Sequence, residues 1–256
     1  MLPSLGPAKH LLLPAIVVGV GLSGFFDGIL LHQVLQWHHL LSLVPGEPYR
    51  SISTQILADG VFHILMYGVT AAGLGLFWMR RKHLGAGNAS SAIAGGSLLG
   101  FGGWNVADVV VFHWAMGIHR IRVNVENPMT YDVAWLAILG LVPLLAGLLV
   151  LRQRPPTSSG RIMASLLVLS TVGTGTLASL PARGQQSTLV LTTSDRSIPV
   201  LNAALASGAG LALFDRDAGI IVLVGANDAV SNEAYRHGAL IVTRSPALAG
   251  CAAAIA

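Results

Sequence analysis

The chain has 256 residues, of which 53% are hydrophobic and only 10% are charged, and its formal net charge is +4. Soluble domains carry roughly 25% charged residues. The composition therefore excludes an ordinary soluble enzyme and indicates a polytopic membrane protein. The basic residues stand in short clusters beside apolar runs, which favours a lipid bilayer as the partner and argues against nucleic acid.

Five apolar segments are long enough to cross a bilayer as helices, at residues 11–39, 54–79, 92–119, 131–151 and 162–180. Clusters of Lys and Arg occupy the connections 80–91 and 152–161. Because such clusters stay in the cytoplasm, we expect the N-terminus and these two loops inside. The loops 40–53 and 120–130 and the C-terminus are then expected outside, on the periplasmic side of a bacterial inner membrane.

After about residue 185 the sequence changes to short alternating runs. These predict strands at 188–193, 211–214, 220–224 and 239–243, and helices at 198–207 and 228–236. This β-α-β-β-α-β order suits a small ferredoxin-like α+β domain. We therefore expect an all-α membrane bundle with a C-terminal α+β domain. The expected units are 1–152 (four transmembrane helices), 153–184 (linker and fifth helix) and 185–256 (an extracytoplasmic domain).

The end of the first span carries an unusual set of ionisable residues, Asp27, His32, His38 and His39. Ionisable groups inside a membrane cost several kcal/mol unless they are paired or bound to a metal. Such residues are therefore read first as a functional site.

The same spacing recurs in the third span. Asp27-x4-His32-x5-His38 is repeated as Asp108-x4-His113-x5-His119. The spans that follow each open on a carboxylate, Asp59 and Asp132. The first four spans therefore look like two copies of one helical hairpin in the same orientation, and sites in duplicated bundles commonly lie between the copies.

Ideal helix geometry predicts the depth of these groups. At 1.5 Å per residue, His32 would lie roughly 9–10 Å deeper than His38 and His39. His113 would lie about 9 Å below His119 in the same way. With His63 one turn from Asp59, three helices would bring one histidine each to a similar depth.

This convergence predicts a metal site with His32, His63 and His113 as central ligands and with further ligands around them. The full set of predicted ligands is His32, His39, Asp59, His63, His113 and His119. Groups expected to orient these ligands or to relay protons are Asp27, Gln36, His38, Asn105, Asp108 and Asp132. Helical angles divide the groups between faces, so two neighbouring metal positions, or one metal with outer partners, fit best. The alternative is histidines that bond Ser, Thr or backbone carbonyls in helix packing.

The donor types narrow the choice of metal. The only cysteine, Cys251, cannot form a thiolate cage, so the ligands are imidazole and carboxylate. These donors suit copper(II), zinc or iron. Placement at the outer surface favours copper or zinc, and the absence of the Glu-x-x-His motif of di-iron bundles counts against iron. Copper is the preferred metal, with zinc and iron as alternatives.

The motifs also resemble those of a known family. Asp27-Gly28 with His32-Gln33 and His38-His39, followed by Asp59-Gly60 and Phe62-His63, resemble domain-of-unknown-function family 2243 of predicted bacterial membrane proteins. Trp104-Asn105 with Asp108, His113 and His119, and then Asp132, look like its remaining motifs. The likeness covers about residues 10–151 and implies an architecture and candidate residues without an established activity. The family tends to carry Glu at 108, a polar residue at 112 and His at 120.

Three functions are compatible with these patterns. The leading hypothesis is an integral membrane metal-binding protein, with copper as the metal and, if it is an enzyme, an oxidoreductase activity. A second is an accessory subunit of a larger respiratory or oxidase-type complex, docked to other membrane subunits through the C-terminal domain. The third is proton or metal-ion transport along the Asp/His column. No catalytic residue and no organic cofactor site are predicted.

Overall fold

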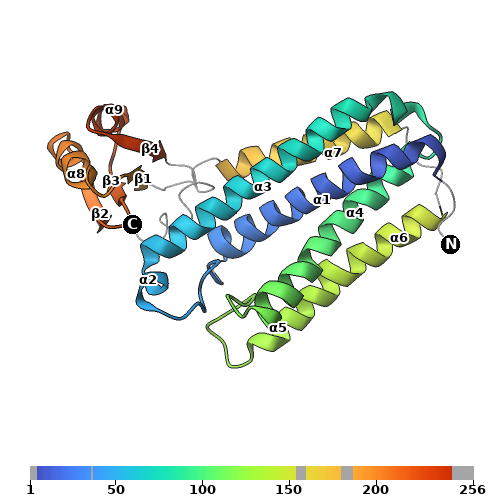
Figure 1. Ribbon diagram of the computed structural model, residues 1–256, viewed down its shortest axis with the longest axis horizontal. Helices are drawn as coiled ribbons and strands as arrows, with labels where there is room; N and C mark the ends of the chain where they lie inside the picture. The colour runs from blue at the N-terminus through green and yellow to red at the C-terminus, as the bar shows by residue number, and fades with distance from the viewer. Residues whose placement is uncertain (1–4, 36, 154–159, 180–186, 244–256) are drawn as a thin grey trace.

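In the computed structural model, long helices form a bundle and a small four-stranded sheet domain lies at one end of it (Figure 1). The structure describes residues 5–35, 37–153, 160–179 and 187–243. Gln36, which was predicted to support the metal ligands, and Cys251 lie outside the described residues.

Helices occupy each of the five predicted spans. The first contains η1 (Gly6–Leu11), α1 (Leu12–Asp27) and η2 (Gly28–Val34); after the short α2 (Glu47–Arg50), the second contains α3 (Ile52–Arg80) and η3 (Arg81–Gly85). The others are α4 (Ala89–Ala107) with η4 (Asp108–Ala115), then α5 (Pro128–Trp135) with η5 (Leu136–Leu141) and α6 (Val142–Gln153), and finally α7 (Gly160–Ser179). The described chain is therefore mostly helical, as the sequence predicts.

Three of these helical segments are long and apolar enough to cross a membrane, namely Gly6–His32, Thr54–Gly85 and Pro128–Arg152. The helix α4 is instead rich in glycine and serine, and it packs against both α1 and α6. A shorter apolar stretch, Gly160–Thr174, belongs to α7. The polytopic helical class predicted from composition is confirmed.

Glycines allow α1 and α4 to approach closely. A Cβ atom on Gly19 would overlap the carbonyl of Ser97, and one on Gly100 would overlap the carbonyl of Ile16. Small residues at such crossings let helix backbones pack in contact, which is the usual solution where lipid offers no hydrophobic driving force. This contact fixes how α1 and α4, the two helices that carry the repeated motif, lie against each other.

The prediction that the first and third spans continue as helices to residues 39 and 119 is wrong. The helices widen into π-helical turns, η2 and η4, and end at Val34 and Ala115. The amide of Trp37 then donates to the carbonyl of Leu31 (2.9 Å), and the chain reverses. At the second end, Ile118 donates to Phe112 (3.1 Å) and Gly117 has a φ of 66°, which favours glycine.

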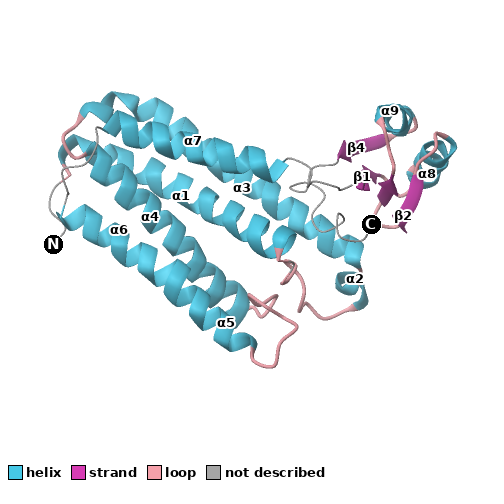
Figure 2. Cartoon of the chain, turned by 180° about the vertical axis from the view of Figure 1, so that it is seen from behind, coloured by secondary structure: helices cyan, strands magenta, loops and turns pink. Residues whose placement is uncertain are grey.

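The loops that follow these two reversals lie side by side at the end of the bundle nearest the sheet domain (Figure 2). The amide of Leu43 in the first loop donates to the carbonyl of Ile118 in the second, at 2.9 Å. The amide of Val123 donates to the carbonyl of Trp37 at 3.3 Å. Backbone hydrogen bonds thus join the two loops into one cap over the helix ends.

The C-terminal domain has the predicted element order. It contains β1 (Ser187–Thr192), α8 (Ser197–Ala206), β2 (Gly210–Asp215), β3 (Ile220–Val224), α9 (Asp228–Arg236) and β4 (Ala239–Thr243). The strands lie in the order β2-β3-β1-β4 and every neighbouring pair is antiparallel. One sheet face packs on α8 and α9, whereas Leu189, Ile220 and Val222 on the other contact Ile56 of α3.

The α1–α4 crossing can be tested with a matched pair of glycine substitutions on one helix. Gly100→Ala forces a methyl group into the Ile16 carbonyl, whereas Gly103→Ala meets nothing within 4 Å. We expect Gly100→Ala to destabilise the protein by about 1–3 kcal/mol. Gly103→Ala should be neutral or stabilising by about 1 kcal/mol, because alanine favours helix. Thermal unfolding in detergent, followed by tryptophan fluorescence, measures both; equal stability of the two variants would contradict the described packing.

Candidate metal centre

Two groups of ionisable side chains gather where α1 and α4 widen into π-helical turns. Asp27 is the last residue of α1, and Asp108 is the first residue of η4. In each group, the histidine five residues after the aspartate lies in the π-helical turn. The second histidine lies on the loop that follows this turn and folds back over it. All six residues of these groups are at most 5% exposed, and they are Asp27, His32, His38, Asp108, His113 and His119.

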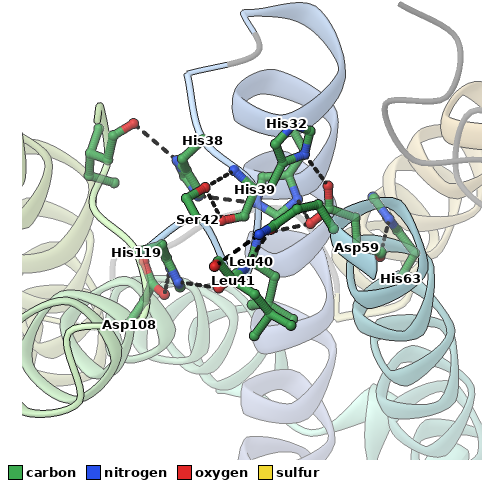
Figure 3. Close-up of polar contacts among 12 residues, drawn as sticks. His32, His38, His39, Leu40, Leu41, Ser42, Asp59, His63, Asp108 and His119 are labelled. Atoms are coloured by element: carbon green, nitrogen blue, oxygen red, sulfur yellow. Dashed lines mark hydrogen bonds and ion pairs between the residues drawn. The ribbon is translucent and has the colours of Figure 1, made fainter. Parts of the chain in front are cut away.

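The first triad consists of Asp27, His32 and His38, whose potential ligand atoms all lie within 4.8 Å of one another. The Nε2 atoms of His32 and His38 are 3.1 Å apart. The sequence placed His38 well above His32 on a continuous helix; this is wrong, because the chain reversal returns His38 to the same depth (Figure 3). One oxygen of Asp27, Oδ1, is buried without a hydrogen-bond partner.

The second triad consists of Asp108, His113 and His119, whose potential ligand atoms also lie within 4.8 Å of one another. The Nε2 atom of His113 lies 3.0 Å from Asp108 Oδ2, and that of His119 lies 3.3 Å from Asp108 Oδ1. The predicted depth difference between His113 and His119 is also wrong, since their ring centroids are 4.6 Å apart. Again the reversal after the π-helical turn is the cause.

The two triads touch each other through the loop histidines. The rings of His38 and His119 stack with centroids 4.8 Å apart and planes inclined by 9°. The helical angles predicted either two neighbouring metal positions or one metal position surrounded by outer partners. The side chains form two neighbouring groups.

Backbone carbonyls fix the tautomers of the two loop histidines. His38 Nδ1 lies 3.0 Å from the carbonyl oxygen of Ile121, and His119 Nδ1 lies 3.0 Å from that of Leu40. A carbonyl oxygen only accepts, so each Nδ1 must carry the proton and donate it. The Nε2 atom of each neutral ring is therefore left as an acceptor that points into its triad.

Carboxylates do the same for the two helix histidines. His32 Nδ1 lies 3.2 Å from Asp59 Oδ1, and His113 Nδ1 lies 2.9 Å from Asp132 Oδ1. Both carboxylates are fully buried. An ionised carboxylate only accepts, so the hydrogen bond to Asp132 holds the proton of His113 on Nδ1. The Asp59 carboxylate lies at ion-pair distance from His32 Nδ1 and favours the proton on that nitrogen. In both rings Nε2 then points into the triad as an acceptor.

Within each triad the facing atoms are therefore all acceptors. In the first triad, the Nε2 lone pairs of the neutral His32 and His38 rings face each other at 3.1 Å. In the second triad, the Nε2 lone pairs of His113 and His119 face the oxygens of the Asp108 carboxylate. Such contacts are repulsive unless a cation lies between them, either a proton or a metal ion. An outer acceptor on the far nitrogen is the usual support of a metal-bound histidine.

The contacts around Asp59 and Asp132 correspond pair by pair. The amide of Leu40 donates to Asp59 (2.8 Å), and the amide of Ile121 donates to Asp132 (3.0 Å). The equivalence ends at the neighbouring residue of each loop. His39 contacts Asp59 at 2.8 Å, whereas Arg120 forms an ion pair with Asp132 at 2.7 Å.

The other predicted ligands lie outside the triads. His39 is 24% exposed and contacts Asp59 from the loop. His63 contacts the Asp59 carbonyl through Nδ1 (2.9 Å), its Nε2 is buried without a partner, and its ring centroid is 6.4 Å from that of His32. Gly28 makes room for this ring, because a Cβ there would overlap it.

Asn105 links three helices below the triads. Its amide nitrogen donates to Ser23 Oγ at 2.7 Å, and its oxygen accepts from Trp135 Nε1 at 2.7 Å. Sequence reasoning expected Asn105 to support the ligands, and the structure gives it a helix-linking position.

Several supporting groups escaped sequence reasoning. The carbonyls of Leu40 and Ile121 carry no side-chain signal, so only the folded loops reveal them. Arg120 could have been found from its register, because it stands one residue after His119 as His39 stands after His38.

A family model described as "Predicted membrane protein (DUF2243)" matches residues 14–154. The chain belongs to this family. The DUF2243 region contains both triads and their outer acceptors, while α7 and the sheet domain lie beyond it. The chain matches no curated protein and no solved structure.

The carboxylate of Asp132 is expected to be the main structural anchor of the second triad. It accepts from His113, Arg120, Ile121 and also Trp114 Nε1 (3.1 Å). Asp132→Ala leaves the buried His113 side chain and the buried Ile121 amide without this acceptor and removes the ion pair with Arg120, so it should cost about 3–5 kcal/mol.

Thermal unfolding in detergent provides the measurement, and Glu126→Ala, which removes an exposed carboxylate from the loop just before α5, is the control. Its expected change is within about 0.5 kcal/mol. Similar losses in the two variants would contradict the anchoring role of Asp132.

Proposed function

We propose that this protein is an integral membrane metalloprotein whose two His-His-Asp triads each bind one transition-metal ion. The observation that carries the proposal is the direction of four imidazoles: every Nδ1 faces an outer acceptor, and every Nε2 points into a triad with a buried carboxylate. Metal ions satisfy facing acceptors of this kind, and outer acceptors raise the basicity of the ligating nitrogen.

Each triad offers two imidazoles and one carboxylate and leaves further coordination positions for water or a substrate. This donor set suits copper(II), zinc and iron(II). We favour copper, as expected from the sequence, and metal analysis of the purified protein decides between the three. With copper or iron the site would support electron transfer, and with zinc it would act as a Lewis acid.

The proposed orientation places the triads near the periplasmic surface. The helix ends opposite the triads carry the described basic residues Arg80, Arg81, Lys82, Arg152 and Arg161. The positive-inside rule assigns these helix ends to the cytoplasm. The loops over the triads and the sheet domain would then face the periplasm, from which a metal ion could enter.

Duplication of a helical hairpin is the origin that we propose for the two triads. It is supported by the shared Asp-x4-His-x5-His spacing and by the paired contacts around Asp59 and Asp132. The halves have since diverged in their outer contacts, because Arg120 stands where the first half has His39.

Binding is better supported than transport through the bilayer. Both triads lie at one end of the helices. The helix segments 12–26, 89–107 and 133–151, which lead away from this end, contain no ionisable side chain. A through path for protons or metal ions would need groups at intermediate depth.

Metal stoichiometry tests the proposal directly. Protein purified in detergent and loaded with copper(II), zinc or iron(II) should retain close to two ions per chain, one per triad, by elemental analysis. His32→Ala with His38→Ala should remove one ion, and His113→Ala with His119→Ala should remove the other. His10→Ala with His83→Ala, at the opposite end of the bundle, is the control and should remove none.

His63→Ala distinguishes the two triads from the ligand set predicted from the sequence, which includes His63. Because His63 lies outside both triads, its loss should leave the metal stoichiometry unchanged. A ratio near zero in the wild type, or an unchanged ratio in both triad variants, would overturn the proposal.

The fixed charge on Arg120 should weaken metal binding at the second triad. Arg120 forms an ion pair with the Asp132 carboxylate, which also contacts Nδ1 of His113. Arg120→His places a histidine beside Asp132, as His39 lies beside Asp59 in the first half. We expect the affinity of the second triad to rise roughly tenfold, the range reported for changes in such outer partners.

Arg122→His removes a charge two residues away, where the side chain lies over Trp37, and is the matched control. Titration calorimetry with the first triad disabled by His32→Ala and His38→Ala isolates the second. An affinity that falls, or that rises equally in the control, would contradict the prediction.

A further inference from the structure

A second feature lies at the other end of the bundle, between α3 and α7. A cavity of about 590 Å³ opens there. It lies where the end of α3 meets the start of α7, at the end of the bundle away from the sheet domain (Figure 1). Its walls are mostly apolar and come from both helices and the turn after α3, through Leu74, Phe77, Leu84, Ala164, Val168 and Leu169. A groove with such walls, between two helices of a membrane bundle, suits a hydrocarbon chain.

Two arginines, Arg81 and Arg161, line the same cavity. The guanidinium of Arg81 lies over the ring of Trp78, 4.4 Å from its centroid, and donates to the Trp78 carbonyl at 2.8 Å. Trp78 is 68% exposed, as is usual for a tryptophan at a membrane interface. The stack holds the guanidinium at the level where lipid headgroups lie.

The described part of the chain supplies no carboxylate at this end of the bundle. The stretches 5–26, 60–107, 133–153 and 160–179, whose helices run to this end, contain no Asp or Glu. Their basic residues are Lys9, Arg80, Arg81, Lys82, Arg152 and Arg161. No carboxylate of these stretches neutralises the two arginines of the groove, so an anion from outside them is needed.

We propose that this groove binds an anionic phospholipid of the surrounding bilayer. The phosphodiester would lie between Arg81 and Arg161, whose planar donors match phosphate oxygens, and an acyl chain would lie along the apolar walls. Basic pockets between transmembrane helices on the cytoplasmic side bind such headgroups. Free phosphate would use the arginines and leave the apolar walls unused, so the lipid accounts for both halves of the groove.

This inference is independent of the proposed metal centre. The groove and the triads lie at opposite ends of the helices and share no residue. Loss of lipid binding would therefore leave the metal stoichiometry as a separate result.

Native mass spectrometry of the full chain, released from detergent with added lipid, tests the proposal. Phosphatidylglycerol should be retained, and phosphatidylcholine with the same acyl chains should bind roughly tenfold more weakly. In the variant Arg81→Gln with Arg161→Gln, binding of phosphatidylglycerol should fall to the level of phosphatidylcholine. Arg50→Gln with Arg122→Gln removes the same net charge at the other end of the bundle and should bind phosphatidylglycerol like the wild type.

A second variant tests the apolar half of the groove. Val168→Trp fills the cavity and keeps both arginines, so it should also lose the bound phosphatidylglycerol. Inorganic phosphate at 10-fold excess over lipid should not displace it. Equal binding of the two lipids, retention in the Arg81 and Arg161 variant, retention in Val168→Trp, or displacement by inorganic phosphate would each overturn the proposal.

Discussion

Two loops hold each other's histidines in place at the end of the bundle. His38 of the first loop donates to a carbonyl of the second, and His119 of the second donates to a carbonyl of the first. This exchange fixes both tautomers, brings the two imidazoles into a stack and closes the bundle over the buried carboxylates. The direction of the Nε2 atoms depends on it, and so does the metal binding proposed for each triad.

The helices provide the frame for that exchange. Glycines at the α1–α4 crossing bring the backbones into contact, and each helix then widens into a π-helical turn beside its aspartate. Such turns in α-helices are frequent at functional sites. Here the turn lets the chain reverse within a few residues, so a histidine beyond the helix end returns to the depth of one inside it. Burial would make these groups costly if they were unpaired, and the outer acceptors offset that cost.

The two halves share a geometry and differ in chemistry. The first supports its helix histidine with Asp59, which has His39 and the backbone of Leu40 as further neighbours. The second uses Asp132, whose charge is neutralised by Arg120. A bound ion would therefore meet a more electron-rich set of ligands in the first triad.

The membrane class, the five helical segments, the element order of the C-terminal domain and the residue types at the site could all be predicted from the sequence. Hydrophobic period, turn residues and motif spacing are local signals, so they predict local structure. Which groups meet depends on how the helices and loops pack, which these local signals do not contain. Ideal helical rise placed His38 far above His32, because the π-helical turn and the chain reversal after Val34 depend on packing between helices. The carbonyls of Leu40 and Ile121 leave no trace in the side-chain pattern, and they became partners of the site only when the two loops met across the bundle.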